Sequence, residues 1–215
     1  MKKESRRLFV LSVCLLLGFI LWTLAICYLD VRAIGPKGSS VGLAALNQSA
    51  HDLIGVHMTL YVITDWLGLV PFAVVFGFAV IGLVQWIRRR KLRKVDSDIL
   101  VLGGFYLITM ILYILFEYVI INYRPILING ILEASYPSST TMLVTCVIPT
   151  AIMQFNKRIK CIWLRQSIAV VLTVFTIFMV IGRLVSGVHW LSDIVGGALL
   201  SAGLVSVYHA VVKAI

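Results

Sequence analysis

Long apolar stretches separated by short polar segments dominate this chain. Six of them are long enough, or nearly long enough, to cross a hydrocarbon core of about 30 Å, which takes about 20 helical residues. They lie at 8–28, 66–87, 99–121, 139–154, 167–183 and 191–212. The pattern therefore predicts an all-α polytopic membrane protein, a bundle of six transmembrane helices in a single domain over 1–215.

Three mixed segments would meet on one side of this bundle. Segment 29–65 starts with the flexible sequence IGPKGSS and continues as a partly apolar stretch, which predicts an interfacial helix leading into the second span. The other two segments are 122–141 and 186–193. We expect the chemistry of the protein, if it has any, to lie among these connections.

Composition and charge placement support and orient this bundle. The chain is 60% hydrophobic and only 13% charged, which leaves too little polar surface for a soluble domain. All Lys and Arg residues but four fall on the side of both termini, and the positive-inside rule makes that side cytoplasmic. The net charge of +10 then reflects short juxtamembrane clusters, which favour contact with anionic lipid over nucleic acid.

The sequence predicts no metal site and no cofactor. The four cysteines show no metal-ligand spacing and imply no disulfide. His51, His57 and His209 have no acidic cluster around them, so we interpret them as interfacial or packing residues. The expected partners are therefore the lipid bilayer and a membrane lipid, with no nucleic acid, and no feature assigns an oligomeric state.

A group of ionisable residues maps to the predicted outer face, although its members are far apart in sequence. Charged groups near hydrocarbon are costly and usually face a polar interior or a partner. The group consists of Glu117, Arg124, Glu133, Arg183, His189 and Asp193. Two arginines beside a histidine and an aspartate are suited to holding and attacking a phosphate, because the planar guanidinium group matches the phosphoryl oxygens.

His189 and Asp193 are four residues apart, a spacing that places them on one face of a helix. A carboxylate on one imidazole nitrogen fixes the tautomer and leaves the other nitrogen free to attack. The simpler alternative is a histidine at a helix start with a capping aspartate. Arg183, six residues before the histidine, favours the catalytic interpretation.

A run of hydroxyl residues precedes the fourth apolar stretch. Ser138, Ser139 and Thr140 follow Tyr136-Pro137, and such residues are strong N-caps. The free N–H groups of the helix start beyond them form a natural anion site. These three residues are therefore candidate phosphate ligands, with simple capping as the alternative.

Region 117–197 resembles the type 2 phosphatidic acid phosphatase family, whose motifs are Lys-x6-Arg-Pro, Pro-Ser-Gly-His and Ser-Arg-x5-His-x3-Asp. Arg183, His189 and Asp193 match the third motif, with Gly182 in place of its serine. The first motif keeps Arg124-Pro125 but has Glu117 in place of its lysine. The second keeps Pro137-Ser138 but has Ser139 and Thr140 in place of its glycine and histidine.

The resemblance implies roles for these residues in a metal-independent lipid phosphatase at the outer face of the cell membrane. His189 would be the nucleophile that forms a phosphohistidine, Asp193 would orient it, and Arg183 would bind the phosphate. The family's second-motif histidine is expected to protonate the leaving group, and Thr140 cannot do so at neutral pH.

The absence of that acid predicts which substrate is preferred. An alkoxide is a poor leaving group without a proton, whereas a lipid phosphate leaving from a diphosphate ionises near pH 6 and needs none. We therefore expect an isoprenoid diphosphate such as undecaprenyl diphosphate to be favoured. Phosphatidylglycerophosphate and phosphatidic acid remain possible if Glu133 or Glu117 acts as the acid, although Glu117 is expected to pair with Arg124.

Two functions of other classes remain open at the level of sequence. The site could bind a lipid phosphate without turnover, as a sensor or a transport component. It could also transfer a phosphoryl or head group to an acceptor other than water. The Arg–His–Asp element argues against pure binding, because a binding site has no need of an oriented imidazole.

Overall fold

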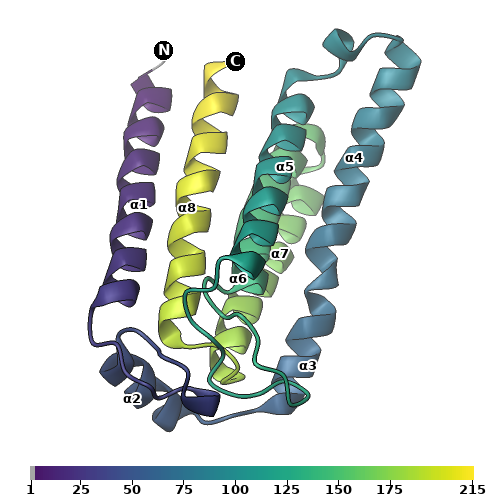
Figure 1. The fold of residues 1–215 in the computed structure, drawn as a ribbon. Coiled ribbons are helices and arrows are strands. Elements are labelled where there is room, and N and C mark those ends of the chain that lie inside the picture. Colours follow the sequence, from purple (N-terminus) through teal and green to yellow (C-terminus); the bar gives the residue numbers. More distant parts are fainter. Residues whose placement is uncertain (1–2) are drawn as a thin grey trace.

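Helices make up the regular structure of residues 3–215, the part of the chain that the computed structural model describes (Figure 1). Eight α-helices and two short 3-10 turns follow one another. They are α1 (Lys3–Tyr28), η1 (Pro36–Gly38), α2 (Ala44–Ile54), α3 (Met58–Leu67), α4 (Leu69–Arg89), η2 (Leu92–Lys94), α5 (Ser97–Tyr118), α6 (Ser139–Arg158), α7 (Ile162–Val185) and α8 (Leu191–Ala214). The prediction of an all-helical membrane protein is confirmed.

Five helical stretches among residues 3–215 are long and apolar enough to cross a membrane. They are α1, the pair α3–α4 taken together, α5, α7 and α8. The pair runs over 32 residues from Met58 to Arg89, so the last residues of the predicted interfacial segment, 58–65, instead begin a helical stretch long enough to cross a membrane. Only α2 remains as a separate short helix outside the long ones.

Helix α6, predicted as the fourth span, is not one of these five, so the count of six spans stays a prediction. It has 20 residues, and many of its side chains, polar ones such as Thr141, Thr150 and Gln154 included, are buried. It lies between α5, α7 and α8 in the middle of the bundle (Figure 1). Neighbouring helices therefore cover its polar groups, and it needs less hydrocarbon surface than the others.

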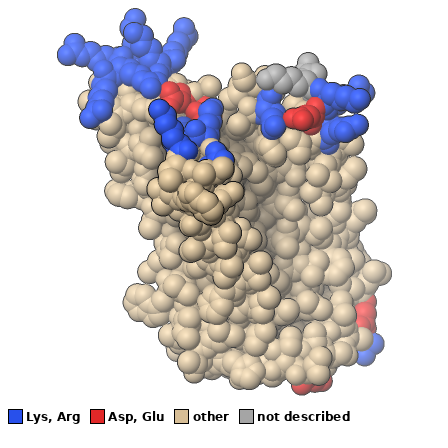
Figure 2. All heavy atoms as spheres, turned by 180° about the vertical axis from the view of Figure 1, so that it is seen from behind, with Lys and Arg blue, Asp and Glu red and all other residues tan. Residues whose placement is uncertain are grey.

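The two ends of the bundle differ in charge. Both termini and the turn between α4 and α5 lie at one end, and α2 and the 119–138 connection lie at the other (Figure 1). Lys and Arg residues gather at the end with the termini, and a broad uncharged surface follows below it (Figure 2). This separation agrees with the expected orientation, in which the end with the termini is cytoplasmic, and that orientation stays a prediction.

Close approaches between segments build the end that carries α2. The 136–138 segment packs against α8 at Gly196, where an added Cβ would lie 2.4 Å from the ring of Tyr136. Asn47 of α2 is buried, and its side chain bonds both the amide and the hydroxyl of Ser192 at 3.0 and 2.9 Å. These contacts fix the connections to the first turn of α8.

Candidate active site

The outer-face residues predicted from the sequence converge at the end of the bundle opposite the termini. Arg124 and Glu133 come from the connection between α5 and α6, and Arg183 comes from the last turn of α7. His189 lies in the turn between α7 and α8, and Asp193 lies in the first turn of α8. The tertiary structure thus brings together residues that are up to 69 positions apart, which is the separation of Arg124 and Asp193.

His189 is at the centre of a hydrogen-bond network that determines its tautomer. Its Nδ1 lies 3.2 Å from the Ser135 hydroxyl, whose own proton is donated to a carboxylate oxygen of Asp193. Because the hydroxyl has a single proton, it must accept from Nδ1–H of the histidine. Nε2 therefore carries the lone pair, and Arg124 and Arg183 each donate to it from 3.4 Å.

Ser135 was not predicted from the sequence, yet it joins the histidine to the aspartate. The direct distance from His189 Nδ1 to Asp193 Oδ2 is 3.8 Å, which is too long for a hydrogen bond, and the serine hydroxyl lies on both. Its amide donates to the Asn122 carbonyl at 2.9 Å, within a short antiparallel pairing that also joins Tyr123 and Ala134. Its position just before the Tyr-Pro-Ser run is the only signal in the sequence.

Asp193 makes two sets of contacts: the capping interaction is observed, and the catalytic interpretation of the His189–Asp193 spacing stays a prediction. Its carboxylate caps α8 by accepting from the Trp190 amide at 2.9 Å, and it also holds Ser135. Helix α8 begins at Leu191, so His189 precedes the helix and does not share a helix face with the aspartate. The capping turn, not a helical repeat, brings the two residues together.

Arg183 is a buried cation whose guanidinium contacts His189. Its side chain is only 1% exposed, its guanidinium lies 5.1 Å from the ring centre of Tyr61, and its Nη1 is 3.5 Å from a carboxylate oxygen of Asp65. Its Nε is buried without a hydrogen-bond acceptor, and its Nη1 makes no hydrogen bond besides the salt-bridge contact with Asp65. Unsatisfied buried donors are costly, and the oxygens of an anion would satisfy them.

The loss of the motif serine at Gly182 has a structural explanation. A Cβ at this position would lie 2.7 Å from a methyl group of Thr64 in α3. The glycine therefore lets α3 pack closely against α7. This approach brings Tyr61 and Asp65, both on α3, to Arg183.

Arg124 pairs with Glu133 and not, as predicted, with Glu117. The Arg124 Nε and a Glu133 carboxylate oxygen are 3.0 Å apart, and the backbones of the two residues are also joined. Helix α5 ends at Tyr118, so Glu117 and Arg124 do not share a helix face. Glu117 has no salt bridge within residues 3–215 and lines the pocket described next.

An open pocket of about 640 Å³ lies in front of the two arginines. Besides Arg124 and Arg183 it is lined by Glu117, Glu133, Asp65, Ser139 and Thr140. Ser138, a predicted phosphate ligand, does not line it, because its hydroxyl caps α6 by accepting from the Thr141 amide. A cavity of about 10 Å³ lined by His189 shares Glu117 and Ser139 with this pocket.

The surroundings of His189 keep its imidazole neutral. Burial, and then the positive charges of Arg124 and Arg183, hold the pKa of His189 well below its ordinary value of 6.5. At neutral pH the Nε2 lone pair is therefore available for attack, as the hydrogen-bond network also requires.

Among residues 3–215, no group of three or more His, Cys, Asp or Glu side chains is placed to hold a metal ion. Two further histidines lie at this end of the bundle but outside the hydrogen-bond network of His189: His51 packs on Trp190 with 5.5 Å between ring centres, and the exposed His57 contacts the Ile54 carbonyl.

Comparison with known proteins places this arrangement in a family. The model of the PAP2 superfamily matches residues 72–215, which include every predicted site residue. A similar fold is seen in the crystal structure of the first transmembrane PAP2 type phosphatidylglycerolphosphate phosphatase from Bacillus subtilis. The TM-score is 0.55 and the sequences are 20% identical, over 95% of this chain and 96% of the other. No curated protein matches the chain. The chain belongs to the PAP2 superfamily and has the fold of its membrane phosphatases.

Proposed function

We propose that this protein is a membrane lipid phosphatase in which His189 attacks the terminal phosphorus of a lipid phosphate. The observation that carries the proposal is the placement of His189 Nε2, which lies 3.4 Å from each of two arginines while Nδ1 is held by Ser135 and Asp193. A phosphoryl group at Nε2 would lie between the two guanidinium groups, which stabilise its transition-state charge.

The reaction proceeds in two steps. Nε2 forms a bond to the terminal phosphorus while the bond from that phosphorus to the leaving oxygen breaks, which leaves a phosphohistidine and releases a lipid monophosphate from a diphosphate, or the lipid alcohol from a monoester. Nδ1 keeps its proton, and the Ser135–Asp193 pair stabilises the positive charge that develops on the ring. A water molecule then attacks the phosphorus, releases inorganic phosphate and returns the electron pair to Nε2.

The residues around the leaving group favour a lipid diphosphate. Thr140 lines the pocket at the motif position where the family has its general-acid histidine, and Glu133 forms a salt bridge with Arg124. A leaving lipid phosphate needs no proton at neutral pH, whereas a leaving alcohol does. We therefore propose an isoprenoid diphosphate such as undecaprenyl diphosphate as the preferred substrate, taken from the outer leaflet of the cell membrane. For a phosphate monoester, Glu117 is the carboxyl group best placed to act as the general acid.

The test is phosphate release by the detergent-purified protein without added metal. Undecaprenyl diphosphate, phosphatidylglycerophosphate and phosphatidic acid are compared at equal concentration. The expected result is release from all three that is fastest for the diphosphate. Phosphatidic acid hydrolysis at an equal or higher rate would contradict the substrate proposal, and product analysis that finds a phosphorylated acceptor in place of phosphate would identify a transferase.

Introducing the family's acid at Thr140 tests the leaving-group argument directly. We expect Thr140→His to raise phosphatidic acid hydrolysis by about a hundredfold, the lower end of the about 10²–10⁴ that a general acid typically contributes. Hydrolysis of the diphosphate should change by less than about threefold. The rates of both substrates measure this, with Ser139→His as the positional control, and an equal gain for both would refute the argument.

Ser135→Ala should lower kcat by about tenfold with little change in KM, because the loss of one hydrogen bond of about 1.4 kcal/mol leaves the imidazole unfixed. Ser135→Thr, which keeps the hydroxyl, should retain most of the rate. Steady-state kinetics of the two variants provide the test. Equal losses in both would mean that packing of the serine, not its hydroxyl, is what the site requires.

The low pKa of His189 sets the pH dependence of kcat/KM. Because Nε2 stays unprotonated until the pH is well below 6.5, activity should persist into acidic buffers and fall only there. Arg124→Gln removes one positive charge and should move this acidic midpoint upward, towards 6.5. A pH series of kcat/KM measures this shift, with Arg32→Gln as the control. A wild-type midpoint above 6.5 would refute the prediction that His189 has a lowered pKa.

A further inference from the structure

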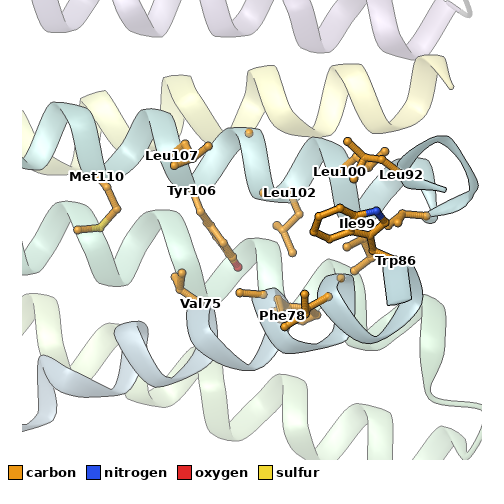
Figure 3. A pocket seen from close by; sticks show the side chains of 16 residues that line it. Val75, Phe78, Trp86, Leu92, Ile99, Leu100, Leu102, Tyr106, Leu107 and Met110 are labelled. Carbon is orange, nitrogen blue, oxygen red and sulfur yellow. The ribbon is translucent and has the colours of Figure 1, made fainter. Parts of the chain in front are cut away.

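An apolar groove separates α4 from α5 in the half of the bundle away from the candidate site (Figure 3). Its volume is about 530 Å³, and none of its lining residues lines the 640 Å³ pocket. Val75, Phe78 and Trp86 line it from α4, and Leu102, Tyr106 and Met110 line it from α5. Apart from one hydroxyl and one indole N–H, these walls offer only hydrocarbon and sulfur, which suits an alkyl chain.

The groove is long and has room for an occupant. Val75 and Trp86 are eleven residues apart on α4, which at about 1.5 Å per residue is roughly 16 Å of helix. Gly103 and Gly104 of α5 line the groove and are exposed, and a Cβ at either would meet no atom within 4 Å. The groove is therefore open beside these two glycines, where no side chain fills the space.

One end of the groove opens at the basic turn between α4 and α5. Leu92 lines the groove at this end together with Trp86 (Figure 3). The turn is fixed by Asp96, which binds Arg89 at 2.7 Å and Gln85 at 2.9 Å. The remaining cations of the turn are exposed and have no acidic partner within residues 3–215; they are Arg88, Arg90, Lys91, Arg93 and Lys94. Lys and Arg residues crowd this corner of the surface (Figure 2).

We propose that this groove binds one acyl chain of an anionic phospholipid from the leaflet at the end where the termini lie, with its phosphate against the basic turn. An alkyl chain matches the apolar walls, and the five unpaired cations at the mouth complement a negative head group. A zwitterionic lipid would fit the walls equally well but would gain less from the cations. This lipid is distinct from the substrate, whose phosphate would enter at the opposite end of the bundle.

Trp86 provides the probe, because it lines the groove next to its mouth. The full chain is reconstituted into phosphatidylcholine vesicles that contain small amounts of phosphatidylglycerol or phosphatidylcholine brominated in the middle of the acyl chain. Fluorescence of Trp86 is isolated as the difference between the wild-type protein and Trp86→Phe. We expect the brominated anionic lipid to quench this difference signal at about a fivefold lower mole fraction than the brominated zwitterionic lipid.

Two further variants separate the groove from the charges. Gly103→Phe fills the groove and should reduce quenching of Trp86 by both lipids. Gly77→Phe on α4 also has open space around it but lies outside the groove, so it should leave quenching unchanged. Changing the five unpaired cations of the turn together to Gln should abolish the preference for the anionic lipid, while Trp86 should still be quenched by both lipids.

Equal quenching by the two brominated lipids in the wild-type protein would overturn the proposal. The proposal would also be overturned if Trp86 were quenched as strongly in Gly103→Phe as in Gly77→Phe. Phosphate release by each variant, measured in parallel, reports that the bundle is folded, because none of these residues lies at the candidate active site.

Discussion

Replacing His189 with alanine is expected to reduce phosphate release by at least about 10⁴-fold, the scale on which removal of a nucleophile acts in enzymes with covalent intermediates. The loss should fall on kcat, because the arginines that would bind the phosphate remain. Phosphate release from the diphosphate substrate, measured with the purified variant, gives the result directly.

His57→Ala is the matched control for this prediction. His57 lies at the same end of the bundle, but it is exposed and its ring's one hydrogen bond within residues 3–215 is to the Ile54 carbonyl, so its loss should change the rate by less than about twofold. Brief incubation of the wild-type protein with radiolabelled substrate, followed by denaturation in alkali, should also trap label on the protein. Activity that survives in His189→Ala would mean that another group attacks the phosphorus.

Arg183→Gln is expected to lower kcat/KM by about 10³-fold, because this arginine would neutralise charge on the phosphoryl group in the transition state. Arg183→Lys should recover only part of the loss, since an ammonium group lacks the planar fork of the guanidinium. Folding should survive either change, because the partner carboxylate of Asp65 is mostly exposed and is not left buried. Steady-state kinetics on the diphosphate measure both variants.

Arg32→Gln controls for the loss of an outer arginine. Its guanidinium is mostly exposed and pairs with Asp30, away from the site, so the rate should stay within about twofold of the wild type. If Arg183→Gln lost only as much as this control, Arg183 would have a structural role in joining α3 to α7, and Arg124 would be the main phosphate ligand.

The departures from the family's motifs have different meanings in the folded protein. Gly182 replaces a serine where α3 needs close contact with α7, so this change is coupled to the new neighbours of Arg183. Thr140 lines the pocket where the family's motif has a histidine, so the general acid expected from the family is missing there. Glu117 replaces a lysine at the same pocket, and no ion pair within residues 3–215 neutralises it.

The sequence by itself determined the helical membrane architecture and the end of the bundle at which the basic clusters lie, and it predicted most of the residues that meet at the candidate site. These features are local, because hydrophobic length, charge placement and the Arg-x5-His-x3-Asp spacing are all properties of short segments. The resemblance to a lipid phosphatase family followed from the same short segments, and the match over residues 72–215 confirms it.

Only the tertiary structure decided how those residues are connected. Ser135 joins His189 to Asp193 because a short pairing of 122–124 with 133–135 places it there, and single serines carry no periodic signal. The same pairing brings Arg124 into a salt bridge with Glu133, whereas the spacing in the sequence had predicted that Arg124 pairs with Glu117. The burial of α6 and the groove between α4 and α5 also depend on how whole helices pack. Such contacts join residues far apart in sequence, so no local pattern specifies them.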